Sequence, residues 1–180
     1  MSARAESAAA TGERIIDAAI EVFWELPHEA VTLDEVARRA GVTVQTVIRR
    51  FGGRDALFAA AAARETERVR EQRYQAPIGD VTAAAGVLLD HYEAMGDRIM
   101  RLLADEDRIP ELRAITDGGR AFHREWCRRV FEPSSPRRLA QVVAVCDVYT
   151  WKLLRRDSGL SRLQTELALV ELLEPLVEGR

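Results

Sequence analysis

The chain has 180 residues, 47% of them hydrophobic, and its 26 basic residues against 29 acidic ones give a net charge of −3. This composition supports a packed core, and it excludes both a largely disordered chain and a globally cationic nucleic-acid binder. The chain has no membrane-length apolar run, no signal-peptide pattern and only two cysteines, so we expect a cytoplasmic protein without a disulfide framework.

The N-terminal segment predicts one helix after a polar arm. Residues 1–10 are small and polar, and we expect them to be disordered. Between residues 11 and 26, apolar side chains recur at helical spacing, at Ile16, Ala19, Ile20 and Phe23. Pro27 has no backbone donor and therefore ends this helix, which we expect to brace the segment that follows.

Residues 32–51 read as two short helices joined by a tight turn. Thr32 can cap the first helix and Glu35 can return the hydrogen bond, which is the pattern of a capping box. Gly41 ends that helix, because glycine takes a left-handed backbone without steric cost. Thr43 is the expected cap of the second helix. The spacing therefore predicts a helix-turn-helix.

The outer face of the second helix is polar and basic. It carries Gln45, Thr46, Arg49 and Arg50, and the stretch from residue 32 to 54 has five arginines against two acidic residues, a net charge of +3. A helix-turn-helix inserts its second helix into the major groove of DNA, where polar side chains reach base edges. The alternative is a helix pair that packs in a core with its arginines merely solvated.

A longer pattern supports the DNA-binding interpretation. The segments IIDAA at residues 15–19, TLDEVA at 32–37, AGVT at 40–43 and RDALF at 54–58, together with Phe23, Thr46, Val47 and Phe51, resemble the N-terminal domain of the TetR family of transcriptional regulators. The resemblance covers about the first 60 residues. It implies an all-α fold with about nine helices, in which a three-helix head is joined by a long helix to a larger helical bundle that dimerises and usually binds a small effector.

The head also departs from the family pattern. The family commonly has Gly at the position of Gln45, Tyr at Ile48, His at Arg50 and Lys at Arg54, and Ile48 cannot replace a tyrosine hydroxyl. We predict phosphate contacts from one set of residues and base or base-adjacent contacts from another. The phosphate set is Thr32, Thr43, Arg50 and Arg54, and the base set is Gln45, Thr46 and Arg49.

The head, which we place at residues 11–58, is followed by a predicted linker helix and a predicted second domain. An alanine-rich linker helix runs from about 54 to 75, and a second domain covers residues 77–180. Asp80 caps a long amphipathic helix, a shorter helix stops at a kink near Gly118-Gly119, and another helix covers residues 120–132. Plain core packing explains the aromatic residues of these helices from sequence alone, whereas the resemblance favours an apolar effector cavity. The residues of this candidate cavity are Tyr92, Met95, Ile99, Phe122, His123, Trp126 and Tyr149.

His123 and Cys127 stand four residues apart, but two ligands do not make a metal site, so we predict no metal. Ser135 and Pro136 open a strong helix, and Ser161 with Gln164 opens a last one that is apolar on more than one side. Such a helix needs two partners, which predicts a four-helix dimer interface, unless the helix is buried within its own chain. The candidate interface residues are Leu139, Val142, Val143, Cys146, Leu167, Val170, Leu173 and Val177.

The sequence thus predicts a homodimeric, ligand-responsive DNA-binding regulator, most often a repressor in the family, that binds a pseudo-palindromic operator and responds to a small apolar or amphipathic effector. We expect no catalysis and no cofactor, because no catalytic set, phosphate loop or metal cluster is visible. Two alternatives remain, an all-helical small-molecule-binding protein and an interaction module without sequence-specific DNA binding.

Overall fold

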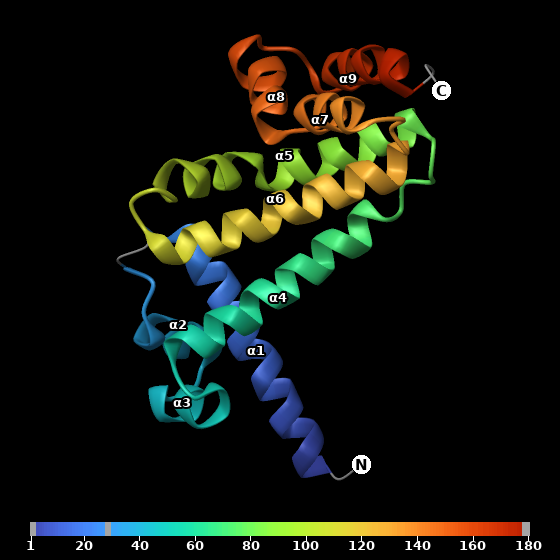
Figure 1. Ribbon diagram of the computed structural model, residues 1–180. Coiled ribbons are helices and arrows are strands. Elements are labelled where there is room, and N and C mark those ends of the chain that lie inside the picture. Colours follow the sequence, from blue (N-terminus) through green and yellow to red (C-terminus); the bar gives the residue numbers. More distant parts are fainter. Residues whose placement is uncertain (1–2, 28–29, 178–180) are drawn as a thin grey trace. The chain divides into compact units, whose positions relative to one another are not determined.

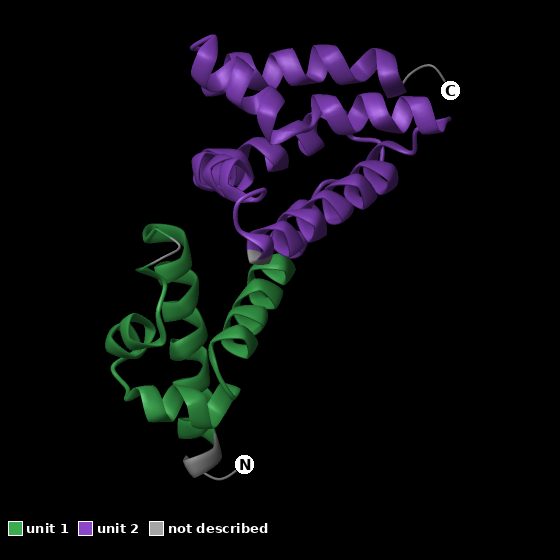
Figure 2. Ribbon diagram, turned by 60° about the vertical axis from the view of Figure 1, so that its left-hand side comes forward, with its two compact units in different colours: residues 1–68 green, residues 69–180 purple. Residues whose placement is uncertain are grey.

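A computed structural model describes residues 3–27 and 30–177, and within them the protein is all-helical, as predicted (Figure 1). The helices follow one another as α1 (Ala3–Glu25), α2 (Leu33–Ala40), α3 (Val44–Phe51), α4 (Arg54–Arg73), α5 (Val81–Asp105), α6 (Pro110–Phe131), α7 (Pro136–Val145), α8 (Val148–Lys152) and α9 (Arg162–Val177). A π-helical turn (Leu153–Asp157) follows α8. The chain divides into two compact units, residues 1–68 and 69–180, with the boundary inside α4 (Figure 2).

The first unit, the head, is built on one face of α1. Ile15, Ala19 and Val22 are buried there and share a core with Val36 of α2 and Val47 of α3. Contrary to the predicted disordered arm, α1 already begins at Ala3. Alanines have the highest helix propensity, and adding turns to a helix that is already packed avoids the cost of nucleation. Residues 1–2 of that predicted arm lie outside the described residues.

The second unit, the body, surrounds a core of large side chains. Trp126 and Phe131 of α6, Trp151 of α8 and Leu88 and Leu89 of α5 are almost completely buried. Helix α5 packs against α6, α8 and α9, and α7 packs against α6 and α9. The predicted N-caps at Asp80 and Ser135 are confirmed. The Asp80 side chain accepts the backbone N–H of Ala83 at 2.8 Å, and the Ser135 side chain accepts that of Arg138 at 3.2 Å.

Two predicted boundaries in the body were wrong. Gly118-Gly119 does not end or kink a helix, because α6 runs through both glycines. The strong helix after Ser135 is interrupted at Cys146, where Asp147 accepts a hydrogen bond from the backbone N–H of Tyr149 at 2.9 Å and caps α8. Asp is a preferred N-cap residue, so the sequence did carry this signal.

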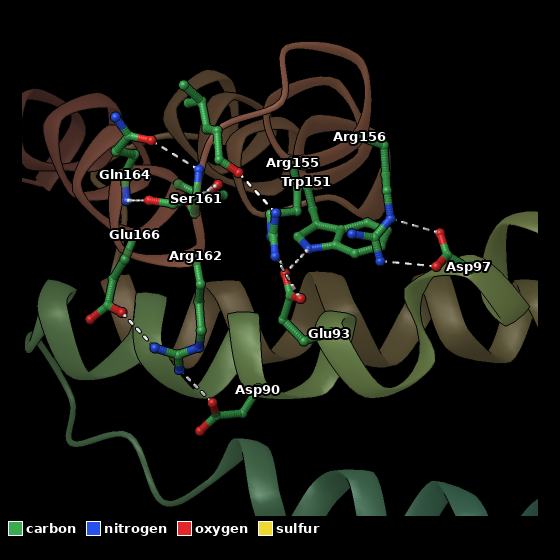
Figure 3. Close-up of polar contacts among 12 residues, drawn as sticks. Asp90, Glu93, Asp97, Trp151, Arg155, Arg156, Ser161, Arg162, Gln164 and Glu166 are labelled. Carbon is green, nitrogen blue, oxygen red and sulfur yellow. Dashed lines mark hydrogen bonds and ion pairs between the residues drawn. The ribbon is translucent and has the colours of Figure 1, made fainter.

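Ion pairs fasten the last third of the chain to α5 (Figure 3). Three carboxylates spaced along α5 each meet one arginine: Asp90 meets Arg162 at 2.5 Å, Glu93 meets Arg155 at 2.8 Å and Asp97 meets Arg156 at 2.9 Å. Trp151 Nε1 also donates to Glu93. The capping box of α9 is complete, since Ser161 and Gln164 each accept the other's backbone N–H at 3.2 and 2.9 Å. Residues on α8, the π-helical turn and α9 are thereby held against one helix.

The α5–α8 contact also requires a residue without a side chain. The Trp151 ring lies against Gly96, where a Cβ atom would stand 2.6 Å from Cη2 and 2.9 Å from Cε3. Trp151 is fully buried, so it cannot swing into solvent to make room. Glycine at position 96 is therefore a packing requirement of the body.

Candidate DNA-binding interface

The two helices of the helix-turn-helix begin and end where the sequence predicted. The Thr32 side chain accepts the backbone N–H of Glu35 at 3.3 Å, and the Thr43 side chain accepts that of Thr46 at 3.2 Å. Gly41 ends α2 in the left-handed conformation, with φ of 65°. The two caps are confirmed, and because each hydroxyl accepts the backbone N–H through one lone pair, capping is compatible with the predicted phosphate contacts of Thr32 and Thr43.

The α3 surface divides as the helical periodicity predicts. Val47 is fully buried against the head core, whereas Gln45, Arg49 and Arg50 are exposed. Thr46 is half-buried, and its hydroxyl lies 2.9 Å from that of Thr43. Ile48, at the position where the family commonly has tyrosine, is 38% exposed and presents an apolar surface beside the polar side chains.

The arginines of α2 form ion pairs within the protein. Glu35 accepts hydrogen bonds from Arg38 at 2.6 and 2.8 Å and from Arg39 at 2.9 Å, and Arg39 also bonds Glu25 of α1 at 2.5 Å. These hydrogen bonds lower the pKa of Glu35 to about 2. Glu35 therefore does not complete the capping box that we predicted. It neutralises α2 instead, because its carboxylate accepts from two cationic guanidinium groups, whereas in a capping box it would accept from one neutral backbone N–H.

The arginines of α3 differ from those of α2. Within the part of the chain that the structure describes, no carboxylate lies within 4 Å of Arg49 or Arg50. Their charges remain available for an external anion. The positive charge of residues 32–54 is thus concentrated on α3, which the sequence count alone could not show.

Arg50 is positioned by the early turns of α1. A Cβ atom at Gly12 would stand 2.6 Å from Nη2 and 2.8 Å from Cζ of Arg50, so the guanidinium lies directly on the α1 backbone. The two helices border a shallow groove of about 370 Å³, lined by Ser7, Ala8, Thr11, Thr46, Arg49 and Arg50. Sequence reasoning missed the contribution of α1, because it treated residues 1–10 as an arm.

Arg54, which we also predicted to contact phosphate, is held by contacts with its own chain. Its guanidinium stacks over the Phe58 ring at 5.3 Å and its Nε donates to the Val31 carbonyl at 3.4 Å. Asp55 lies 3.9 Å away as a weak ion-pair partner. Arg54 therefore supports the junction between the α2 N-terminus and α4, and only its exposed part remains for a phosphate.

The body brings together most, but not all, of the candidate effector residues. Tyr92 and Trp126 belong to one buried cluster, Ile99 and Phe122 are half-buried against it, and buried His123 lies against the Trp126 ring. Met95 is buried but is not part of this cluster. Tyr149 is 50% exposed and is therefore a poor candidate for a buried effector site. Tyr149 follows the break at Cys146 that separates α7 from α8, and this break changes the direction in which the later residues point.

The candidate dimer residues divide into two groups. Leu139, Val142, Cys146 and Leu173 are at most 7% exposed and belong to the core of their own chain, so their assignment to a dimer surface was wrong. Val143, Val170 and Val177 are half-buried, and Leu167 is 54% exposed. The sequence pattern identified the apolar residues, but it could not distinguish the core face from an outer face. The large exposed apolar residues of this region are Tyr149, Leu153, Leu163, Leu167 and Leu172.

The described ranges, 3–27 and 30–177, hold neither a metal-binding group nor a membrane-spanning helix. Within them, no three His, Cys, Asp or Glu side chains gather as a metal-binding group. None of their helices combines the length and the apolar character that crossing a bilayer requires.

Comparison with known proteins identifies the head. Residues 15–61 match the family model for bacterial regulatory proteins of the tetR family. The chain is 45% identical over 62 residues to the HTH-type transcriptional regulator SrpR of Pseudomonas putida, a match that covers 34% of this chain and 29% of SrpR. It is 36% identical over 89 residues to an uncharacterized HTH-type transcriptional regulator of Mycobacterium tuberculosis, covering 49% of this chain and 43% of that protein. The match thus spans less than half the length of these curated relatives.

Solved structures extend the likeness to the body. A transcriptional regulator from Rhodococcus sp. Rha1 superimposes with a TM-score of 0.69 at 22% identity, over 93% of this chain and 96% of that chain. A tetR-family transcriptional regulator from Streptomyces coelicolor gives a TM-score of 0.67 at 22% identity, over 92% of this chain and 81% of that chain. At this identity the likeness establishes a shared fold. Together with the family match over residues 15–61, it shows that the head resembles the N-terminal domain of bacterial regulatory proteins of the tetR family and that the whole chain shares the fold of these solved regulators.

Proposed function

We propose that this protein is a transcriptional repressor that binds a pseudo-palindromic DNA operator as a homodimer and releases it when a small apolar or amphipathic effector binds the body. The observation that carries the proposal is the composition of the α3 surface. Gln45, Arg49 and Arg50 are exposed on a helix that is capped and buried on its other face, and both arginines lack an acidic partner among the described residues.

In this proposal, some side chains contact phosphates and others contact bases. Arg50, backed by Gly12, contacts phosphate and fixes the register of the helix, and Arg54 adds a weaker phosphate contact. Gln45 and Arg49 read base edges, since a glutamine can bond adenine and an arginine can bond guanine in the major groove. The Thr32 and Thr43 hydroxyls cap their helices and add phosphate contacts through their O–H groups, and Thr46, whose hydroxyl shares a hydrogen bond with that of Thr43, contacts bases at the edge of the interface.

The experiment that tests the function is selection of bound sequences from a random duplex library at two salt concentrations. An enriched inverted repeat with half-sites about one helical turn apart, roughly 34–36 Å, supports a dimeric operator binder. Binding without an enriched motif that is lost steeply with salt would indicate phosphate attraction only. Absence of binding at either salt concentration would favour an interaction module or a small-molecule-binding protein.

Dimerisation is proposed through the outer face of α9. Leu163 and Leu167 lie one turn apart and are 66% and 54% exposed, and half-buried Val170 continues the same stripe. The double substitution Leu163→Glu and Leu167→Glu should give a monomer in analytical ultracentrifugation with an unchanged circular-dichroism spectrum. Glu171→Gln on the exposed surface of α9 serves as the control. A dimer that survives the double substitution would exclude this face.

A further inference from the structure

The early turns of α1 project beyond the core of the head. Within residues 6–14, all of which the structure describes, Gly12 alone is buried. The α1 residues that pack into the head core begin at Ile15. Gly12 is covered instead by the guanidinium of Arg50 on α3, which lies against the α1 backbone. This part of α1 therefore meets the recognition helix outside the core.

Glycine at position 12 does not serve the stability of the head. It lies in the third turn of a 23-residue helix, where glycine is less favourable than alanine. A Cβ atom there would stand 2.6 Å from Nη2 and 2.8 Å from Cζ of Arg50. Arg50 is exposed, so its flexible end can move aside, whereas the buried Trp151 ring at Gly96 cannot. The glycine is therefore not a packing requirement, and what it preserves is the location of the Arg50 guanidinium.

The groove between α1 and α3 suits an anion. It is open to solvent, has a volume of about 370 Å³, and is lined by two arginines, three hydroxyl residues and one alanine, without an acidic side chain. Glu13, which lies close to the lining residues in sequence, is paired with Arg64 of α4. Two neighbouring cations repel each other, and an anion between them relieves this repulsion. A phosphodiester group of a DNA backbone has the charge and the acceptor oxygens that such a groove can bind, and a duplex can reach it from solvent.

The Ser7 hydroxyl is the donor that α1 adds to this groove. Ser7 is exposed, and a serine hydroxyl has one proton to donate. The Thr11 hydroxyl lines the same groove but donates to the Ser7 carbonyl at 2.9 Å, so its proton is used within the helix. The Thr46 hydroxyl shares its hydrogen bond with that of Thr43. Ser7 and Arg50 therefore offer donors to one anion from the two helices that border the groove.

We infer that this groove holds one backbone phosphate of the operator in each head, bound by Arg50 and Ser7, and that Gly12 is a positioning residue for the Arg50 guanidinium. The inference rests on the proposed DNA-binding function and adds α1 to the surface that contacts DNA. Phosphate contacts carry no direct sequence information, so the site fixes the orientation of the head on the duplex. Because the guanidinium already lies on the α1 backbone, less side-chain freedom is lost when DNA binds.

The substitution Gly12→Ala tests the positioning role in the full-length protein. Its affinity for a scrambled duplex, measured by fluorescence anisotropy, should be at least about threefold lower than that of the wild type, because a displaced guanidinium loses part of a charge-assisted hydrogen bond. Its melting temperature should not fall, since alanine favours the helix. In an Arg50→Ala background the same substitution should leave the affinity unchanged, because Gly12 acts through Arg50. Gly118→Ala, the matched exchange in α6, should not alter the affinity of the wild type.

The substitution Ser7→Ala tests the contribution of α1. Loss of its hydrogen bond should lower the affinity for the operator and for a scrambled duplex alike, by roughly two- to tenfold. Thr11→Val is the matched control, since it removes a groove hydroxyl whose proton is already used within the helix. Its affinity should equal that of the wild type. Equal losses in the two variants would overturn the role of Ser7.

Failure of this site can be distinguished from failure of the proposed function. If the wild type bound neither duplex at low salt, the DNA-binding proposal would be wrong and the phosphate site would be wrong with it. If the wild type bound DNA and Gly12→Ala bound it as tightly, the site alone would be wrong. The same conclusion would follow if Gly12→Ala weakened binding equally in the Arg50→Ala background.

Discussion

Removal of Arg50 should change how DNA affinity depends on salt, and removal of Arg38 should not. Both side chains are exposed on the helix-turn-helix, but Arg38 is held by two hydrogen bonds to Glu35, while Arg50 has no carboxylate partner among the described residues. Each phosphate that an arginine neutralises contributes about 0.9 to the slope of log affinity against log salt. Arg50→Ala should therefore reduce the slope by about 0.9 per head, or about 1.8 for a dimer.

This difference is large enough to measure. Between 50 and 200 mM salt, a slope change of about 1.8 makes the affinity ratio of wild type to Arg50→Ala shrink roughly twelvefold. Fluorescence anisotropy on the selected operator and on a scrambled duplex gives both slopes, and Arg50→Ala should weaken binding to the two duplexes alike. If Arg38→Ala lowered the slope as much as Arg50→Ala, the distinction between paired and free arginines would be refuted.

Four further variants test other parts of the structure. Gln45→Ala should lower discrimination between operator and scrambled duplex by about 1–3 kcal/mol with little change in scrambled-duplex affinity, and equal losses on both would contradict base reading. Gly96→Ala should lower the melting temperature by about 4–8 °C, because the clash with Trp151 costs about 3 kcal/mol and the gain in helix propensity returns only about 1. A Cβ atom at position 118 would have no neighbour within 4 Å, so Gly118→Ala should raise the melting temperature by about 2–4 °C. If Gly96→Ala and Gly118→Ala shifted the melting temperature in the same direction, this packing argument would be refuted. Glu35 has a pKa of about 2 in the folded chain against an ordinary 4.5, so its stabilising effect is full above pH 4.5 and is lost as the pH falls toward 2. Glu35→Gln should therefore flatten the loss of stability in urea unfolding between pH 5 and 2, and parallel curves for the two proteins would exclude this role.

The helix caps were the most predictable part of the fold. A cap is a local event, in which a side chain bonds a backbone group two or three residues away, so its signal is contained in the sequence. Thr43, Asp80, Ser135 and the Ser161–Gln164 box were all found in this way. Recognition of the head depended on the same feature, because a correctly spaced series of caps and apolar positions extends over some 60 residues.

The candidate sites were less predictable, because they depend on which long-range partner each side chain meets. The sequence counted five arginines near the recognition helix, but only the fold shows that Arg39 is bound by Glu25, fourteen residues earlier. Likewise, Leu139 and Leu167 both stand on apolar stripes, yet one lies in the core and the other on the surface. Arg73, predicted only as part of a linker helix, is buried beside aromatic rings that are distant in sequence.

The two consecutive glycines in the middle of α6 leave that helix geometrically continuous but unequal in stability. Both are exposed and neither has a neighbour that requires the absence of a side chain, so each lowers local helix stability by about 1 kcal/mol relative to alanine. Beyond them, Trp126 and Cys127 anchor the C-terminal half in the core. The N-terminal half has fewer buried side chains and is held by Leu112 and by the hydrogen bond from Thr116 to Glu106 at 2.5 Å. Amide hydrogens before Gly118 should consequently exchange with solvent through local opening, well before those of the C-terminal half, which exchange only when the core opens.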